Sequence, residues 1–85
     1  MADYKIFFKK SVRKDFKSIP DSTLTKIIEC TNSLSNNPRQ IGCAKLSGQE
    51  KYRMRYGQYC IIYSIQDDEL TVWIVKAGHR KDVYR

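Results

Sequence analysis

Two arginines separated by one residue, Arg53 and Arg55, are the side chains of this sequence best suited to bind a phosphate group. A guanidinium holds phosphate through two parallel hydrogen bonds and keeps its charge at any working pH. Alternate residues of a β-strand point to the same face of a sheet, so a strand through this segment puts both arginines on one face. The pattern favours an anion-binding face, and a strand that merely faces solvent is the alternative.

The polar tail, residues 79–85, holds the second group of candidates: His79, Arg80, Lys81 and Tyr84. Histidine changes its charge near neutral pH, and a tyrosine ring can stack on a nucleobase. We expect the tail to contribute neither core residues nor an element of its own. If it folds beside the arginine strand, Arg80 joins the two arginines in one site; a frayed, charged terminus is the alternative.

A hairpin over residues 52–64 is expected to position the arginines. Its two strands meet at Gly57 and Gln58, and glycine in the first position suits a type II′ turn. This turn sets a register that divides the side chains between two faces. The apolar and aromatic face collects Tyr52, Met54, Tyr56, Tyr59, Ile61 and Tyr63. The arginine face collects Arg53, Arg55, Cys60, Ile62 and Ser64.

Two amphipathic helices and two more strands complete the predicted fold. Residues 4–8 form a β-prone first strand, and apolar residues at helical spacing follow over residues 11–19 and 21–34, separated by Pro20. Residues 44–46 are extended, and the apolar run 70–77 reads as a strand covered on both faces. The predicted order is β-α-α-β-β-β. This is one α+β domain, residues 1–85, with a mostly antiparallel sheet and a helical hairpin packed on one face.

Composition restricts the partners. Sixteen Lys and Arg against nine Asp and Glu give a net charge of +7, which favours RNA, DNA or an acidic protein as partner. Three widely spaced cysteines and one histidine do not make a zinc site, so we expect no metal and no cofactor. We expect reduced thiols in a cytoplasmic protein without a signal peptide or a membrane span.

Further basic residues are candidates for RNA binding. One face of the first helix carries Lys10, Arg13, Lys14 and Lys17, which either form a solvated face or widen an RNA footprint. Lys45 and Lys51, on either side of the turn before the hairpin, and Lys81 in the tail complete this set. The sequence shows neither the paired carboxylates of a standard hydrolase nor a glycine-rich phosphate loop.

The order of several short motifs resembles the RelE/ParE toxin superfamily, and its RelE branch in particular. The motifs are Asn37-Pro38-Arg39, Gly42, Lys45-Leu46-Ser47-Gly48, Tyr52-Arg53-Met54-Arg55, Tyr59-x-Ile61-Ile62-Tyr63 and Gly78-His79-Arg80-Lys81-Asp82-Val83-Tyr84. The resemblance implies a toxin of a toxin–antitoxin pair, whose partners are an acidic antitoxin, the ribosome and mRNA. It also implies cleavage of mRNA in the ribosomal A site, with the substrate's own 2′-hydroxyl attacking the adjacent phosphate.

By motif position, Arg53 and Arg55 match the basic strand residues near the scissile phosphate. Arg80 matches the tail arginine that stabilises phosphate charge. Tyr84 matches the tyrosine that stacks on the substrate, and His79 holds a basic position able to handle protons. All five are therefore expected to be catalytic.

This chain departs from the family pattern at one position, and two alternative functions remain open. Many members carry arginine where this chain has Cys60, so we expect Cys60→Arg to add a third cation, accelerate cleavage and cost the fold little. A ParE-like poison of DNA gyrase, without nuclease chemistry, is the first alternative. A plain RNA-binding module is the second.

Overall fold

Five strands form a single sheet in the computed structural model, which describes residues 3–46, 48 and 50–83. The strands are β1 (Lys5–Phe8), β2 (Cys43–Lys45), β3 (Lys51–Tyr56), β4 (Tyr59–Gln66) and β5 (Thr71–His79). Their order across the sheet is β1-β5-β4-β3-β2. Strand β1 runs parallel to β5, and the other neighbours are antiparallel. The predicted α+β fold is confirmed, with β2 as a paired strand where only an extended segment was expected.

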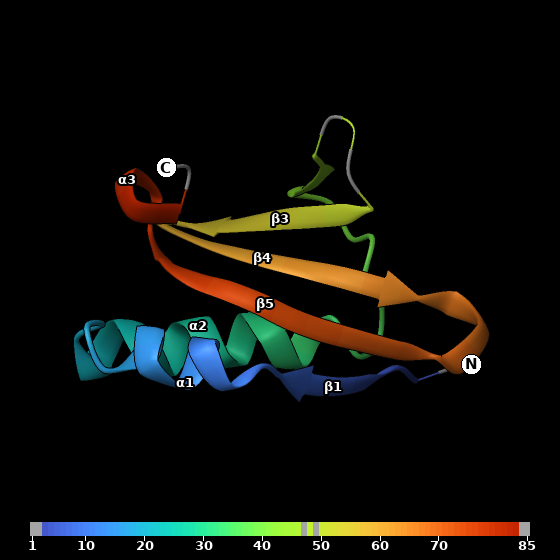
Figure 1. Cartoon of the computed structure of the whole chain (residues 1–85), viewed down its shortest axis with the longest axis horizontal. Coiled ribbons are helices and arrows are strands. Elements are labelled where there is room, and N and C mark those ends of the chain that lie inside the picture. Colours follow the sequence, from blue (N-terminus) through green and yellow to red (C-terminus); the bar gives the residue numbers. More distant parts are fainter. Residues whose placement is uncertain (1–2, 47, 49, 84–85) are drawn as a thin grey trace.

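The helices α1 (Lys10–Phe16) and α2 (Asp21–Ser33) cover one face of this sheet (Figure 1). Their apolar stripes meet the inward residues of the strands, because burial of apolar surface is the main favourable term in folding. Asp15 fixes α1 against β5: its Oδ2 accepts a hydrogen bond from the Ala77 N–H at 3.3 Å. The buried core consists of Val12, Ile19, Ile27, Leu34, Met54, Ile61, Tyr63, Val72, Ile74 and Ala77.

The arginine hairpin has the predicted register. Arg53 pairs with Ile62, and Arg55 pairs with Cys60. Gly57 has φ +59°, as the first position of the predicted type II′ turn requires. Because Met54 is buried beside the helices, Arg53 and Arg55 lie on the opposite face.

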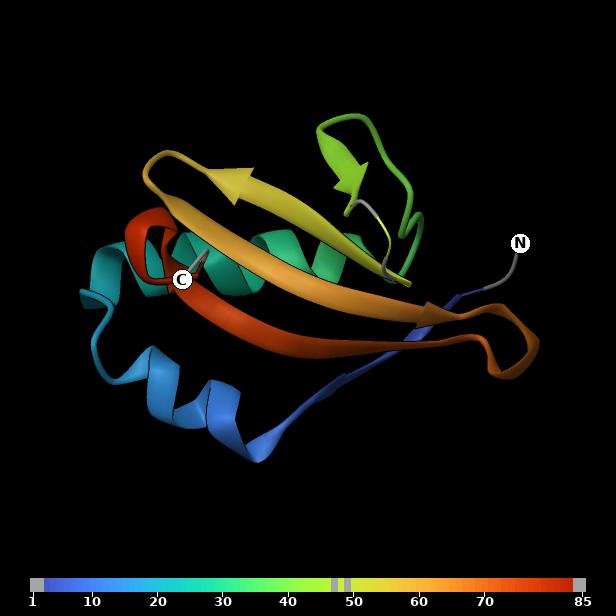
Figure 2. The same ribbon diagram turned by 45° about the horizontal axis from the view of Figure 1, so that its top comes forward.

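The face of the sheet away from α1 and α2 is largely open. Figure 2 shows β3, β4 and β5 turned toward the viewer, with a short helix, α3 (Arg80–Val83), over one end. The prediction that the tail forms no element and contributes nothing to the core is therefore wrong. Val83 is only 8% exposed and packs on Cys60 and Ile62 from the open side. Burial of this one apolar residue holds a short, otherwise polar helix in place.

The opposite end of the sheet is fastened by Asp67, in the 3₁₀ turn η1 (Asp67–Glu69). Arg39 donates to both carboxylate oxygens, at 2.9 and 2.7 Å, and the Tyr4 hydroxyl donates to Oδ1 at 2.8 Å. These hydrogen bonds, that of Arg39 first, lower the pKa of Asp67 to about 2. The buried Tyr63 hydroxyl donates to the Pro38 carbonyl at 2.7 Å, and burial raises the Tyr63 pKa. The Asn37-Pro38-Arg39 segment thus ties the long loop to the sheet.

Leu70, between η1 and β5, adopts a left-handed backbone with φ 51° and is 40% exposed. Its carbonyl accepts the Lys5 N–H at 2.8 Å, which begins the parallel pairing of β1 with β5. In the part of the chain that the structure describes, no helix is long and apolar enough to cross a membrane.

Candidate functional site

The candidate site is the arginine face where α3 crosses it. Val83 contacts Cys60 and Ile62, the cross-strand partners of Arg55 and Arg53. A Cβ built on Gly78, which pairs with Cys60, would lie 3.7 Å from Cγ2 of Val83. The tail helix therefore lies directly beside the two arginines. This arrangement is the condition for a joint site named in the sequence analysis.

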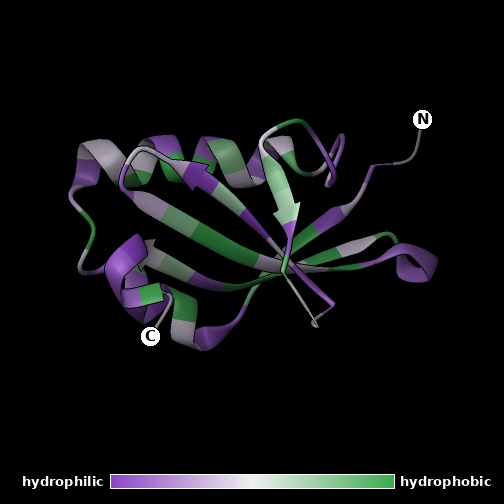
Figure 3. Cartoon of the chain, turned by 90° about the horizontal axis from the view of Figure 1, so that it is seen from above, coloured by the Kyte–Doolittle hydropathy of each residue, from purple (hydrophilic) through white to green (hydrophobic). Residues whose placement is uncertain are grey.

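Two hydrogen bonds fix the start of α3, and one of them joins it to the hairpin. The Arg80 N–H donates to the Gln58 carbonyl, in the β3–β4 turn, at 2.8 Å. The Lys81 N–H donates to Nδ1 of His79 at 3.2 Å, so the histidine caps the first turn of the helix. Arg80 and Lys81 are exposed, and Figure 3 shows α3 coloured mostly as hydrophilic. Their charges consequently stand in solvent at the arginine end of the sheet.

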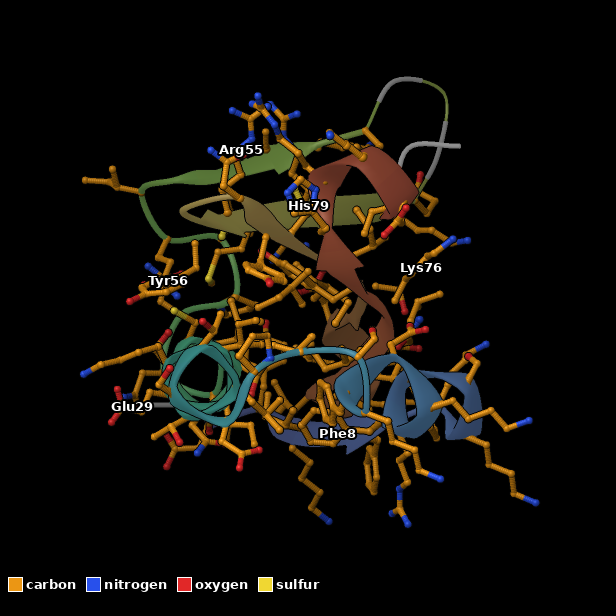
Figure 4. All side chains as sticks on the ribbon, turned by 90° about the vertical axis from the view of Figure 1, so that its left-hand side faces the viewer. Phe8, Glu29, Arg55, Tyr56, Lys76 and His79 are labelled. Carbon is orange, nitrogen blue, oxygen red and sulfur yellow. The ribbon has the colours of Figure 1, made fainter. Side chains whose placement is uncertain are left out.

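His79 lies at the end of the sheet rather than on the arginine face. It pairs with Tyr59, and the two rings meet edge to face with centroids 5.6 Å apart. Figure 4 looks onto this end and shows His79 and Arg55 in the upper half of the view, with Glu29 of α2 and Phe8 of β1 in the lower half. Since Nδ1 accepts the Lys81 N–H, the neutral ring carries its proton on Nε2 and offers a donor there. To act as a base in this position, His79 must give up the helix cap.

Lys51 and Lys76 also lie on the arginine face. Lys51 is two residues before Arg53 on β3, and Lys76 pairs with Ile62 across β4 and β5. Lys76 was not among the predicted site residues. A shift of register between Ile62 and Tyr63 moves it onto this face, and nothing in the sequence marks that irregularity.

The other predicted RNA-binding residues lie elsewhere. Lys45 pairs with Tyr52, so it lies on the helix side of the sheet, and its Nζ is 3.8 Å from Glu50. The first-helix cations are exposed on α1 and its flank, on the helix side of the molecule, and form a separate basic surface: Lys10, Arg13, Lys14 and Lys17. Tyr84 lies outside the described residues, so its predicted stacking role stays a prediction.

The charged residues of the described strands that lie on the arginine face are all positive. None of the five described strands contains Asp or Glu. Of the strand residues, the cations on this face are Lys5, Lys51, Arg53, Arg55 and Lys76. The nearest acid in sequence on α3, Asp82, is exposed. Cations brought together without carboxylates among them attract a polyanion and concentrate it at this face.

Cys60 does not offer a place for a third strand cation. The register puts it on the arginine face, opposite Arg55, but its side chain is 0% exposed beneath α3. This burial argues against the expectation that Cys60→Arg costs the fold little. The small side chain of Cys60 leaves room for Val83 to pack on it.

Comparisons with known proteins agree with this architecture. Residues 6–84 match the family model described as ParE toxin of the type II toxin–antitoxin system, parDE. Toxin RelG of Mycobacterium tuberculosis is 31% identical over 86 residues, which cover 96% of this chain and 97% of RelG.

Solved structures extend the agreement to three dimensions. The toxin–antitoxin complex RelBE2 of Mycobacterium tuberculosis contains a chain that superposes with a TM-score of 0.81, at 28% identity and 94% coverage of both chains. The RelE–RelB complex of Pyrococcus horikoshii OT3 gives a TM-score of 0.79 at 27% identity, covering 92% of this chain and 96% of its match. Both of these relatives were crystallised together with their antitoxins.

Proposed function

The chain belongs to the RelE/ParE superfamily of type II toxins, and on that premise we propose that it is a ribosome-dependent endoribonuclease that cuts mRNA in the A site. The observation that carries this proposal is the seat of α3: Val83 packs on the strand partners of Arg53 and Arg55 and brings Arg80 to the same end of the sheet. A phosphate placed there meets cations from two separate elements.

The proposed reaction needs charge stabilisation more than it needs a strong base. The 2′-oxygen forms a bond to phosphorus while the bond to the 5′-oxygen breaks, leaving a 2′,3′-cyclic phosphate and a 5′-hydroxyl. The 2′-hydroxyl loses a proton, and the leaving oxygen gains one. Negative charge grows on the phosphate as it becomes five-coordinate, so fixed arginines stabilise that state more than the ground state.

The residues present suit separate roles. Arg53, Arg55 and Arg80 hold phosphate oxygens, and they are poor bases because a guanidinium is not deprotonated in proteins. His79 in its capped form donates a hydrogen bond from Nε2 to the substrate or the leaving oxygen. We propose that Tyr84 stacks on a base and that the ribosome supplies part of the proton transfer.

The partners follow from family and charge. We propose that an acidic antitoxin covers the arginine face and that the exposed cations of α1 contact ribosomal RNA. Both would engage a chain of net charge +7. The proposed place of action is the cytoplasm, where ribosomes and mRNA are found.

Cleavage of mRNA on purified ribosomes, mapped by primer extension, tests the function. Parent protein should cut within the A-site codon, and Arg80→Ala should slow single-turnover cleavage by about ten-fold or more, since a charge-assisted hydrogen bond contributes about 1.5–3 kcal/mol. Its stability should change by no more than about 0.5 kcal/mol, because Arg80 is exposed. The control is Lys26→Ala, which removes an exposed cation of α2 whose Nζ lies 3.7 Å from Glu29.

Two results would contradict the proposal. A folded Arg80→Ala protein that cuts as fast as the parent removes Arg80 from the site. Intact mRNA together with inhibited supercoiling by DNA gyrase would instead support the ParE-like poison, the first alternative in the sequence analysis.

A further inference from the structure

The open face carries an aromatic pair at the end away from α3. Phe7 on β1 and Trp73 on β5 are cross-strand partners, with ring centroids 5.0 Å apart and ring planes 28° from parallel. Phe7 is 42% exposed and Trp73 is half-buried. Large apolar rings are normally covered in a small domain, so a stacked pair on an uncovered face suggests a binding role.

The register ties this pair to the cationic part of the face. One cross-strand row runs over four strands as Lys51, Ser64, Trp73 and Phe7. The adjacent row contains Arg53, Ile62 and Lys76. Trp73 and Lys76 are an odd number of residues apart and would point to opposite faces of a regular strand. The register shift between Ile62 and Tyr63 brings them to the same face.

A polar acceptor lies one row further along the strands. Gln66 shares its row with Thr71 and Lys5, and its Oε1 is buried without a hydrogen-bond partner. Its Nε2 donates to Ser64 Oγ at 3.5 Å, in the row of Trp73. A buried acceptor left unpaired costs free energy, and because Oε1 has no exposed surface, a ligand reaches it only if the Gln66 side chain turns.

We propose that the Phe7–Trp73 pair is a stacking platform for a base of single-stranded RNA, beside the nucleotide whose phosphate Arg53 and Arg55 hold. The proposal rests on the proposed nuclease function and adds a substrate-binding subsite to it. The base lies on the rings, and neighbouring phosphates meet Lys51 and Lys76. Aromatic platforms on open sheets bind bases in this way because every base has a flat π-face.

RNA fits the face better than a protein segment. The apolar part is a single aromatic pair framed by an amide, a hydroxyl and lysines, whereas a docked helix needs a continuous apolar stripe. The acids closest to the platform in sequence are Asp3, before β1, and Asp67, Asp68 and Glu69 in η1, and Asp67 is already paired with Arg39. The Arg55 row lies four residues of β4 away from the Trp73 row, about 13 Å at about 3.3 Å per residue. That separation puts the platform at a flanking nucleotide rather than at the scissile phosphate.

Trp73 is the only tryptophan of the chain, so its fluorescence reports on the platform directly. Titration with hexaadenylate RNA should quench it, because a stacked base contacts the indole. Inorganic polyphosphate, which has charge but no bases, should compete for binding without quenching. Absence of quenching at RNA concentrations that saturate binding by anisotropy would overturn the proposal.

Variants separate the rings from the charges. With labelled hexaadenylate in an anisotropy assay, Trp73→Leu should weaken binding by about 5- to 150-fold, the equivalent of one lost stacked base. Trp73→Phe should retain most of the affinity, and Phe7→Leu, at an exposed edge position, should lose part of it. The control Tyr56→Leu removes an equally exposed ring, 39% accessible, from the other face of the sheet and should bind like the parent.

The outcomes distinguish the platform from the proposed function. Quenching by RNA without mRNA cleavage on ribosomes would reject the nuclease and keep the platform. Normal cleavage with equal RNA affinity in the parent and Trp73→Leu would reject the platform and keep the nuclease. Loss of antitoxin binding in Trp73→Leu, with RNA affinity unchanged, would assign the pair to the protein partner and overturn the proposal.

Discussion

The substitution Cys60→Arg tests whether α3 depends on the small side chain beneath it. Cys60 is fully buried in a cluster with Ile62 and Val83, opposite Arg55. An arginine at this position either lifts Val83 from its seat or leaves its guanidinium without water. In this chain we therefore expect a loss rather than a gain.

The expected loss is about 2 kcal/mol. Overfilling a packed site costs about 1–3 kcal/mol, and like charges opposed across two strands add roughly 0.2–1 kcal/mol. For a domain of this size, 2 kcal/mol lowers the melting temperature by roughly 8–16 °C, since 1 kcal/mol corresponds to about 4–8 °C. Displacement of α3 also removes Arg80 from the arginine face, so cleavage should slow.

Thermal unfolding followed by circular dichroism and single-turnover cleavage of ribosome-bound mRNA provide the two measurements. Gln58→Arg is the matched control, because it adds the same charge in the exposed turn of the same hairpin. The reasoning is refuted by a Cys60→Arg protein that melts with the parent and cuts faster. That result would mean that position 60 reaches the phosphate and that Val83 is not held on it.

Three further outcomes are expected. Asp67→Asn should lose stability that depends on pH. Because the Asp67 pKa is lowered to about 2, the ion pair with Arg39 stabilises the fold above about pH 4 and is lost as the pH falls through about 2. The urea midpoints of parent and variant should therefore differ at pH 7 and converge at low pH. Leu70→Gly should raise the unfolding free energy by about 0.5–1 kcal/mol, because relief of the left-handed strain exceeds the added chain entropy; a lower midpoint in urea would contradict this. Association with an acidic antitoxin should slow as salt rises, since steering is screened over roughly 8–10 Å, and stopped-flow rates indifferent to salt would exclude steering.

Local sequence patterns were sufficient to predict most of the fold and the shared face of Arg53 and Arg55. Gly57 in a two-residue turn sets the hairpin register, and strict alternation then separates Met54 from Arg53 and Arg55 without any tertiary information. These features are local in the chain, so composition and period are sufficient to predict them. The predicted hairpin began at residue 52, and the structure extends the arginine strand by one residue to Lys51.

The seat of the tail was decided by tertiary contacts. A polar segment of seven residues has no helical signal of its own. Packing of Val83 on Cys60 and Ile62, together with the hydrogen bond from the Arg80 N–H to the Gln58 carbonyl, holds α3 in place. The role of His79 as a helix cap follows from that docking, because its acceptor serves a helix that the sequence did not predict.

Which side chains lie together on the open face could be established only from the structure. The sequence by itself determined that Arg53 and Arg55 share a face, because two residues of one strand are related by a fixed period. Whether Lys76 and Trp73 join them depends on pairing between strands that are distant in the chain and on one register shift within it. A shift of one residue exchanges the two faces of a strand, and its energy lies in packing against neighbours rather than in the residues themselves. Only the assembled sheet therefore decides which cations and rings meet on its open side.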